Sequence, residues 1–82
     1  VMIKIKIKCF SQVKYALGKE EVELELEAGT TTQEVERLIR KKTNGNLDNV
    51  SLSVAVNKKY ISTEMVLNDG DEVAFIPPVQ GG

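Results

Sequence analysis

The sequence has no histidine and no tryptophan, and it contains a single cysteine among its 82 residues. Without histidine, the chain lacks the material for an ordinary zinc site and for a nucleophile that a neighbouring imidazole activates. One cysteine cannot build a disulfide framework, and this usage is typical of the reducing cytoplasm. We therefore expect no stably bound metal or cofactor and no independent catalytic site in this chain.

The sequence also lacks an excess of charge of either sign, and it has no long hydrophobic run. The 11 basic and 12 acidic residues give a formal net charge of −1, so no net basic field favours nucleic acid or a membrane surface as a partner. The apolar stretch at residues 3–9 carries lysine at every second position, which argues against a membrane span or a signal peptide. The length fits one small domain, which we expect to be cytoplasmic.

Two segments near the start alternate strictly between apolar and charged residues. Residues 2–10 alternate isoleucine with lysine, and residues 21–27 alternate valine or leucine with glutamate. This period of two predicts two half-buried strands, paired antiparallel so that the glutamates face the lysines. Cys9 continues the isoleucine row and is expected in the core, whereas Phe10 has the parity of the lysines and is expected to point outward.

The middle of the chain predicts one main helix. Residues 11–19 are interpreted as a connection with a bend at Gly18. After Gly29, the spacing of Thr31 and Glu34 is that of a capping box, and an apolar stripe with an i,i+4 ion pair follows it. The stripe consists of Val35, Leu38 and Ile39, and the pair of Glu36 and Arg40.

Further short strands are predicted in the second half. Residues 52–57 alternate in the same way as the first strands, Tyr60-Ile61 is a candidate short strand, and residues 73–76 are apolar at both parities. The last pattern predicts a strand buried on one face and partly covered on the other. Residues 68–71 (NDGD) predict a tight turn, and residues 65–67 (MVL) before it are expected to be tucked under the domain.

These elements predict an α+β fold of the β-grasp, or ubiquitin-like, type. We expect a mixed sheet of four to five strands, with the first and last strands side by side in its middle and the helix packed across it. The domain is expected to occupy residues 1–76, and residues 77–82 to form a projecting tail. Fold alone does not give function.

The tail is the most informative stretch of the chain. Pro77 and Pro78 fix an extended path, and Val79 and Gln80 lead to Gly81 and Gly82. Because glycine has no Cβ, a narrow groove of another protein could close around this backbone. An ordinary frayed terminus is the alternative interpretation.

Three segments resemble the MoaD family of molybdopterin synthase small subunits. They are Val54–Asn57 (VAVN), residues 69–82 (DGDEVAFIPPVQGG), and Phe10–Val13 (FSQV) with the later Gly18. The resemblance implies that an ATP-dependent, E1-like enzyme adenylates Gly82 and that a sulfur donor protein converts it to a thiocarboxylate. It also implies that the large subunit of molybdopterin synthase receives the tail, and that the sulfur passes to cyclic pyranopterin monophosphate. The acyl adenylate and the thiocarboxylate are the only covalent intermediates expected on the chain.

A docking surface can be predicted from strand parity. Phe10 and Ile76 both point outward by alternation, and Tyr60 could join them. Outward apolar residues beside the root of the tail are typical of a partner surface, although the three could also merely cap an open edge of the sheet. Other functions stay open: a thiamin-type sulfur carrier, a ubiquitin-related protein modifier, or a β-grasp adaptor without sulfur chemistry.

Overall fold

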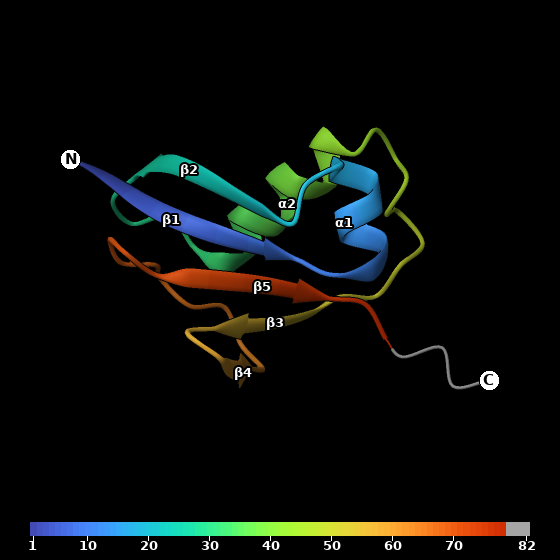
Figure 1. Cartoon of the computed structure of the whole chain (residues 1–82). Coiled ribbons are helices and arrows are strands. Elements are labelled where there is room, and N and C mark those ends of the chain that lie inside the picture. The colour runs from blue at the N-terminus through green and yellow to red at the C-terminus, as the bar shows by residue number, and fades with distance from the viewer. Residues whose placement is uncertain (79–82) are drawn as a thin grey trace.

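The computed structural model describes residues 1–78, which form a five-stranded sheet and two helices (Figure 1). In the sheet, the strands lie in the order β2-β1-β5-β3-β4. The elements are β1 (Met2–Cys9), α1 (Ser11–Leu17), β2 (Glu21–Glu27), α2 (Thr32–Lys42), β3 (Ser53–Val56), β4 (Lys59–Ile61) and β5 (Glu72–Ile76). No helix within residues 1–78 is long and apolar enough to cross a membrane.

The pairing of β1 with β5 confirms the predicted β-grasp arrangement. β1 is antiparallel to β2 and parallel to β5, and β5 is antiparallel to β3. The first and last strands therefore lie side by side in the middle of the sheet. Figure 1 shows α2 behind the sheet, and α1 at the end of the sheet where β5 finishes.

The core lies between the sheet and α2. The alternation in β1 buries its isoleucines and Cys9, as predicted, while Val73 and Phe75 extend the same apolar layer from β5. Val35 and Ile39 from α2 cover this layer and are fully buried. Thr31 caps α2 and accepts a hydrogen bond from the backbone N–H of Glu34 at 3.4 Å, which confirms the N-cap half of the predicted capping box.

The interpretation of residues 11–19 as a plain connection is wrong, because α1 occupies most of this segment. Gly18 ends the helix in the left-handed conformation at φ 74°, and its N–H donates to the carbonyl oxygen of Lys14. Val13 is the buried anchor of α1 and joins the main core. The helix has seven residues and no side-chain cap at Phe10, so the usual signals of a helix start and of a long apolar stripe are missing.

A second correction concerns residues 65–67, of which only Leu67 is buried. Met65 and Val66 are exposed, and the backbone of this segment pairs with the start of α2. The N–H of Thr32 donates to the carbonyl oxygen of Met65 at 2.9 Å, and Val66 forms an isolated bridge with Thr31. Backbone hydrogen bonds and the buried side chain of Leu67 together hold this stretch in place.

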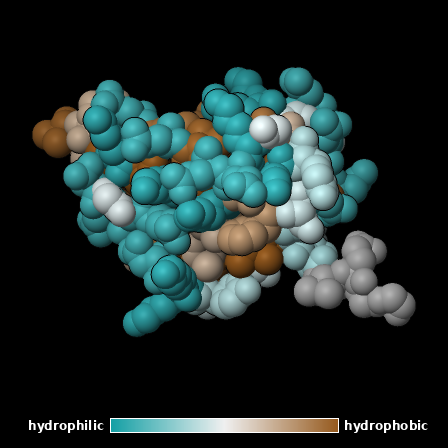
Figure 2. All heavy atoms as spheres, viewed as in Figure 1, coloured by the Kyte–Doolittle hydropathy of each residue, from teal (hydrophilic) through white to brown (hydrophobic). Residues whose placement is uncertain are grey.

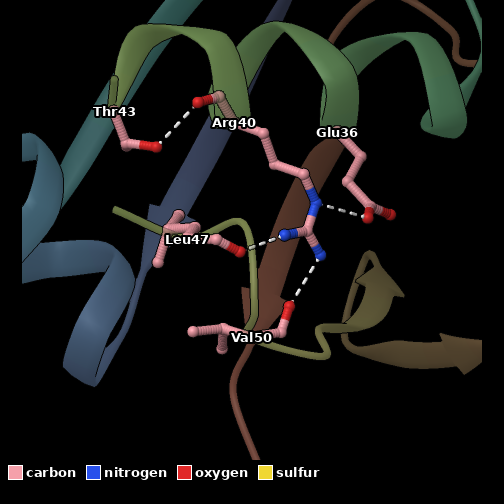
Figure 3. A network of polar contacts seen from close by, with 5 residues as sticks. All are labelled: Glu36, Arg40, Thr43, Leu47 and Val50. Atoms are coloured by element: carbon pink, nitrogen blue, oxygen red, sulfur yellow. Dashed lines mark hydrogen bonds and ion pairs between the residues drawn. The ribbon is translucent and has the colours of Figure 1, made fainter. Parts of the chain in front are cut away.

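Arg40 organises the long connection between α2 and β3 (Figure 3). Its Nε donates to Glu36 at 3.0 Å, which confirms the predicted ion pair, and its Nη2 donates to the carbonyl oxygen of Val50 at 2.9 Å. The Nη1 group donates to the carbonyl oxygen of Leu47. The connection is therefore held by the side chain of Leu47, which is buried in the core, and by the hydrogen bonds from Arg40 to its backbone.

A candidate docking surface beside the C-terminal segment

The face of the sheet opposite α2 changes from charged to apolar across its width. Lys8 of β1 lies between Glu21 of β2 and Ala74 of β5, and the same row continues through Ala55 to Tyr60 of β4. The lysine–glutamate part confirms the predicted facing of the two charged rows. Ala74 and Ala55 follow Lys8 in this row. Because an alanine side chain ends at Cβ, these two residues form a shallow floor between the taller side chains on either side.

Strand register also brings Phe10 and Ile76 to one end of this floor. Cys9 pairs with Phe75 across β1 and β5, so the residues that follow these two lie next to each other. Phe10 is 47% exposed and Tyr60 is 71% exposed, while Ile76 is half-buried. The prediction that Phe10 points outward is therefore confirmed.

The three predicted partner-binding residues line a single hollow of about 600 Å³. Figure 2 shows an apolar area on this face, in the lower middle of the view, below a band of hydrophilic residues. We call this area the outer patch; it consists of Phe10, Ala55, Tyr60, Ala74 and Ile76. An exposed apolar area with a polar rim is typical of a protein–protein contact.

Charged residues form the rim of the outer patch. Lys8 and Glu21 make an ion pair at 2.8 Å, and Lys14 and Glu20 make one at 3.0 Å. In each pair the side-chain hydrogen bond raises the pKa of the lysine and lowers the pKa of the glutamate. The rim on the side of β1 and α1 is therefore largely neutralised.

A polar network next to Lys58 and Glu72, which border the hollow on its other side, was not predicted from the sequence. The Asn57 side chain donates from Nδ2 to Asp71 Oδ1 at 2.9 Å, and Asn57 Oδ1 accepts from the N–H of Glu72 at 3.0 Å. Asp71 Oδ2 also accepts from the N–H of Asn68 at 2.8 Å. The network ties the β3–β4 turn and the predicted 68–71 turn to the start of β5. Turn residues spaced 14 positions apart carry no local signal of such a contact.

The single thiol belongs to the core, although Cys9 also borders the hollow of the outer patch. Cys9 is buried, and burial raises the pKa of its thiol, with a smaller contribution from the nearby Glu21 carboxylate. The thiolate is the nucleophilic form of cysteine, and the raised pKa keeps the Cys9 thiol neutral. Cys9 therefore acts as a core residue and not as a nucleophile. This confirms the prediction of its place in the isoleucine row.

The predicted tail begins directly at the outer patch. Pro77 follows Ile76 and is buried, and Pro78 is exposed. The remaining tail residues named in the sequence analysis, Val79, Gln80, Gly81 and Gly82, lie outside the described residues. The division between a domain at 1–76 and a tail at 77–82 stays a prediction.

Comparisons with known proteins agree on one family. A model of the ThiS family matches residues 7–82. The chain is 38% identical over 85 residues to the molybdopterin synthase sulfur carrier subunit of Dictyostelium discoideum, covering 96% of each chain. It is 29% identical to a Pyrococcus furiosus protein assigned as molybdopterin converting factor subunit 1, with a TM-score of 0.82 and coverage of 94% and 99%.

One similar solved structure is a protein–protein complex of subunits 1 and 2 of the molybdopterin-converting factor from Helicobacter pylori. The TM-score is 0.68 at 23% identity, and the match covers 98% of this chain and 100% of the other. This likeness shows a shared fold alone.

Proposed function

Because this chain belongs to the ThiS family, we propose that it is the sulfur-carrier subunit of a molybdopterin synthase. The observation that carries the proposal is its likeness, over nearly the whole length of both chains, to a relative that bears this name. The outer patch supports it independently, because an apolar surface beside the root of a Gly-Gly tail suits a chain that presents its end to a partner.

Activation of the Gly82 carboxylate is the first proposed step. A carboxylate is a poor electrophile, so an E1-like enzyme uses ATP: a carboxylate oxygen attacks the α-phosphorus, and pyrophosphate leaves. A sulfur donor protein then delivers sulfur at the oxidation level of hydrosulfide. This sulfur attacks the acyl carbon, AMP leaves, and a thiocarboxylate remains at Gly82.

The thiocarboxylate needs no side chain of its own protein to become reactive. Its sulfur is anionic near neutral pH and a better nucleophile than a carboxylate oxygen. The large subunit supplies the acid–base groups and binds cyclic pyranopterin monophosphate. The sulfur bonds to a carbon of this substrate, water then cleaves the acyl–sulfur bond, and Gly82 returns to a carboxylate. Two loaded chains therefore supply the two sulfur atoms of the dithiolene. This chain contributes the sulfur and its positioning.

Docking is assigned to the outer patch. Phe10, Tyr60 and Ile76 contact the large subunit, and the residues from Pro77 to Gly81 thread the tail into its active site. The patch and the tail are adjacent, since Pro77 directly follows Ile76. A contact at the patch therefore sets the starting point of the tail. We place the reaction in the cytoplasm, where ATP is available to the activating enzyme.

Reconstitution tests the proposal. The chain is incubated with an E1-like enzyme, ATP and a sulfide source, and then with the large subunit and cyclic pyranopterin monophosphate. Formation of the dithiolene product, with none in the absence of this chain, is expected. A chain that fails here but forms isopeptide conjugates with lysines of cellular proteins is a protein modifier instead.

A further inference from the structure

The β3–β4 hairpin contains a lysine in a backbone conformation that favours glycine. Val56 pairs with Lys59, so the connection consists of Asn57 and Lys58 alone. Both have positive φ, at 52° and 71° respectively. Two-residue hairpin loops with positive φ at both positions are type I′ turns, for which Asn-Gly is the favoured sequence. Lys58 therefore stands where glycine is preferred.

The left-handed conformation costs Lys58 free energy, because its Cβ approaches the following carbonyl oxygen. Asparagine tolerates this conformation, but lysine is not among the residues that visit it routinely. The turn is held in place by the hydrogen bonds of Asn57 with Asp71 and Glu72. The backbone N–H of Asn57 also donates to the carbonyl oxygen of Glu72 at 2.7 Å. Strain of this kind persists where the surroundings fix the backbone, and it is often found at functional sites.

The fixed turn places Lys58 on the rim of the outer patch. Lys58 lines the hollow of the patch and also the neighbouring polar hollow on the same face. The other two rim lysines, Lys8 and Lys14, are neutralised by glutamates. Among the described residues, Lys58 forms no ion pair and is exposed, whereas the nearby Glu72 is half-buried. Lys58 is thus the rim cation that remains available.

We propose that Lys58 is a specificity-determining residue of the docking surface and pairs with a carboxylate that the partner presents beside the outer patch. This inference rests on the proposed function, since it takes the outer patch as the contact with the large subunit. A charge at the rim of an interface acts mainly on the association rate and on its salt dependence. A glycine at position 58 would relieve the strain of the turn but would leave no charge at the border of the patch. Lys58 places its ammonium group there.

The test uses the full chain and the molybdopterin synthase large subunit from the same genome. Lys58→Gln removes the charge and keeps the strain, and Lys58→Gly removes both. Lys59→Gln is the matched control, because Lys59 pairs with the buried Val56 and alternation directs it away from the face that carries Tyr60. Association rates are measured by stopped-flow at low and high ionic strength, and each free variant is melted.

We expect both Lys58 variants to associate about two- to five-fold more slowly at low ionic strength, with a weaker salt dependence. Lys58→Gly should also raise the melting temperature by about 4 °C as the strain is lost. The Lys58→Gln variant should melt like the wild type, and Lys59→Gln should change neither property. Association at the wild-type rate by Lys58→Gln, or an equal loss in Lys59→Gln, overturns the assignment.

Phe10→Ala distinguishes this failure from a failure of the proposed function. Weak binding by Phe10→Ala together with normal binding by Lys58→Gln removes the role of Lys58 and leaves the outer patch as the docking surface. Normal binding by both variants means that the partner does not contact the patch at all, which overturns the docking assignment as well.

Discussion

Cys9 and Phe75 lie opposite each other in the parallel pair of β1 and β5. Both side chains are buried in the core, so the residue that follows each of them in extended conformation faces the other side of the sheet. Phe10 and Ile76 are those two residues, and they line the same hollow. One register thus fixes the core, the outer patch and the root of the tail together.

The first prediction concerns this pair. Phe10→Ala and Ile76→Asp should each weaken binding of the large subunit by about 2 kcal/mol or more, because central apolar anchors dominate interface energies. Ile76→Asp should have the larger effect, since a charge would be desolvated at the contact. Calorimetric titration measures both affinities.

Tyr15→Ala is the matched control, because Tyr15 is an aromatic residue of α1 that is 82% exposed and lies outside the outer patch. It should bind normally. The free Phe10 and Ile76 variants should melt close to the wild type. Unfolding of free Ile76→Asp would show that Ile76 supports the core, and equal losses in all three variants would show that the patch is not special.

The second prediction concerns the end of the tail. Deleting Gly82 should abolish sulfur loading, because the carboxylate is moved back by one residue from the activating site. The melting temperature should stay within about 1 °C of the wild type, since the last residues of a chain commonly contribute little to stability. Mass spectrometry after loading and a thermal melt are the two measurements. A deletion variant that still accepts sulfur would contradict the assignment of Gly82.

The third prediction tests the need for glycine at position 81. Gly81→Val should block adenylation or sulfur delivery, because a β-branched side chain is bulky and stiff at χ1 where a narrow groove must close. Gln80→Val introduces the same side chain one residue earlier, where the sequence already has a large residue, and should retain activity. If both variants load and transfer sulfur normally, the partner groove is wide and the glycines have another role.

The fourth prediction follows from the buried thiol. Burial raises the pKa of Cys9 in the folded state, so at alkaline pH the unfolded chain loses its thiol proton first. The contribution of Cys9 to stability is complete below the ordinary cysteine pKa of about 8.5 and declines as pH rises through the folded value. Thermal melts should therefore show the stability gap between wild type and Cys9→Ala narrowing above that pH. A gap independent of pH up to 10.5 would contradict the assignment of a buried neutral thiol.

Much of the fold could be predicted because its strands alternate so regularly. The rows of β1 and β2 place Phe10 and Cys9 on opposite faces without any knowledge of the partner strands. Helix α1 could not be predicted, because a seven-residue helix with one buried anchor, Val13, and no side-chain cap has no distinct periodicity.

The polar network at the β3–β4 turn could not be predicted from the sequence for a different reason. The hydrogen bond between Asn57 and Asp71 joins residues 14 positions apart, and it depends on how β3 and β5 are aligned. The positive φ of Lys58 follows from the two-residue connection that the pairing of Val56 with Lys59 leaves between β3 and β4. Sequence patterns report local preference, and here tertiary contacts override it.

The central claim is that this chain carries sulfur at Gly82, and intact mass spectrometry tests it most directly. The purified chain is incubated with ATP, an E1-like enzyme and a sulfur source, and its mass is compared with that of a sample lacking ATP. The expected result is a gain that matches the replacement of one oxygen by one sulfur, located by fragmentation at Gly82. An unchanged mass under conditions in which a known carrier of the same family is loaded would contradict it.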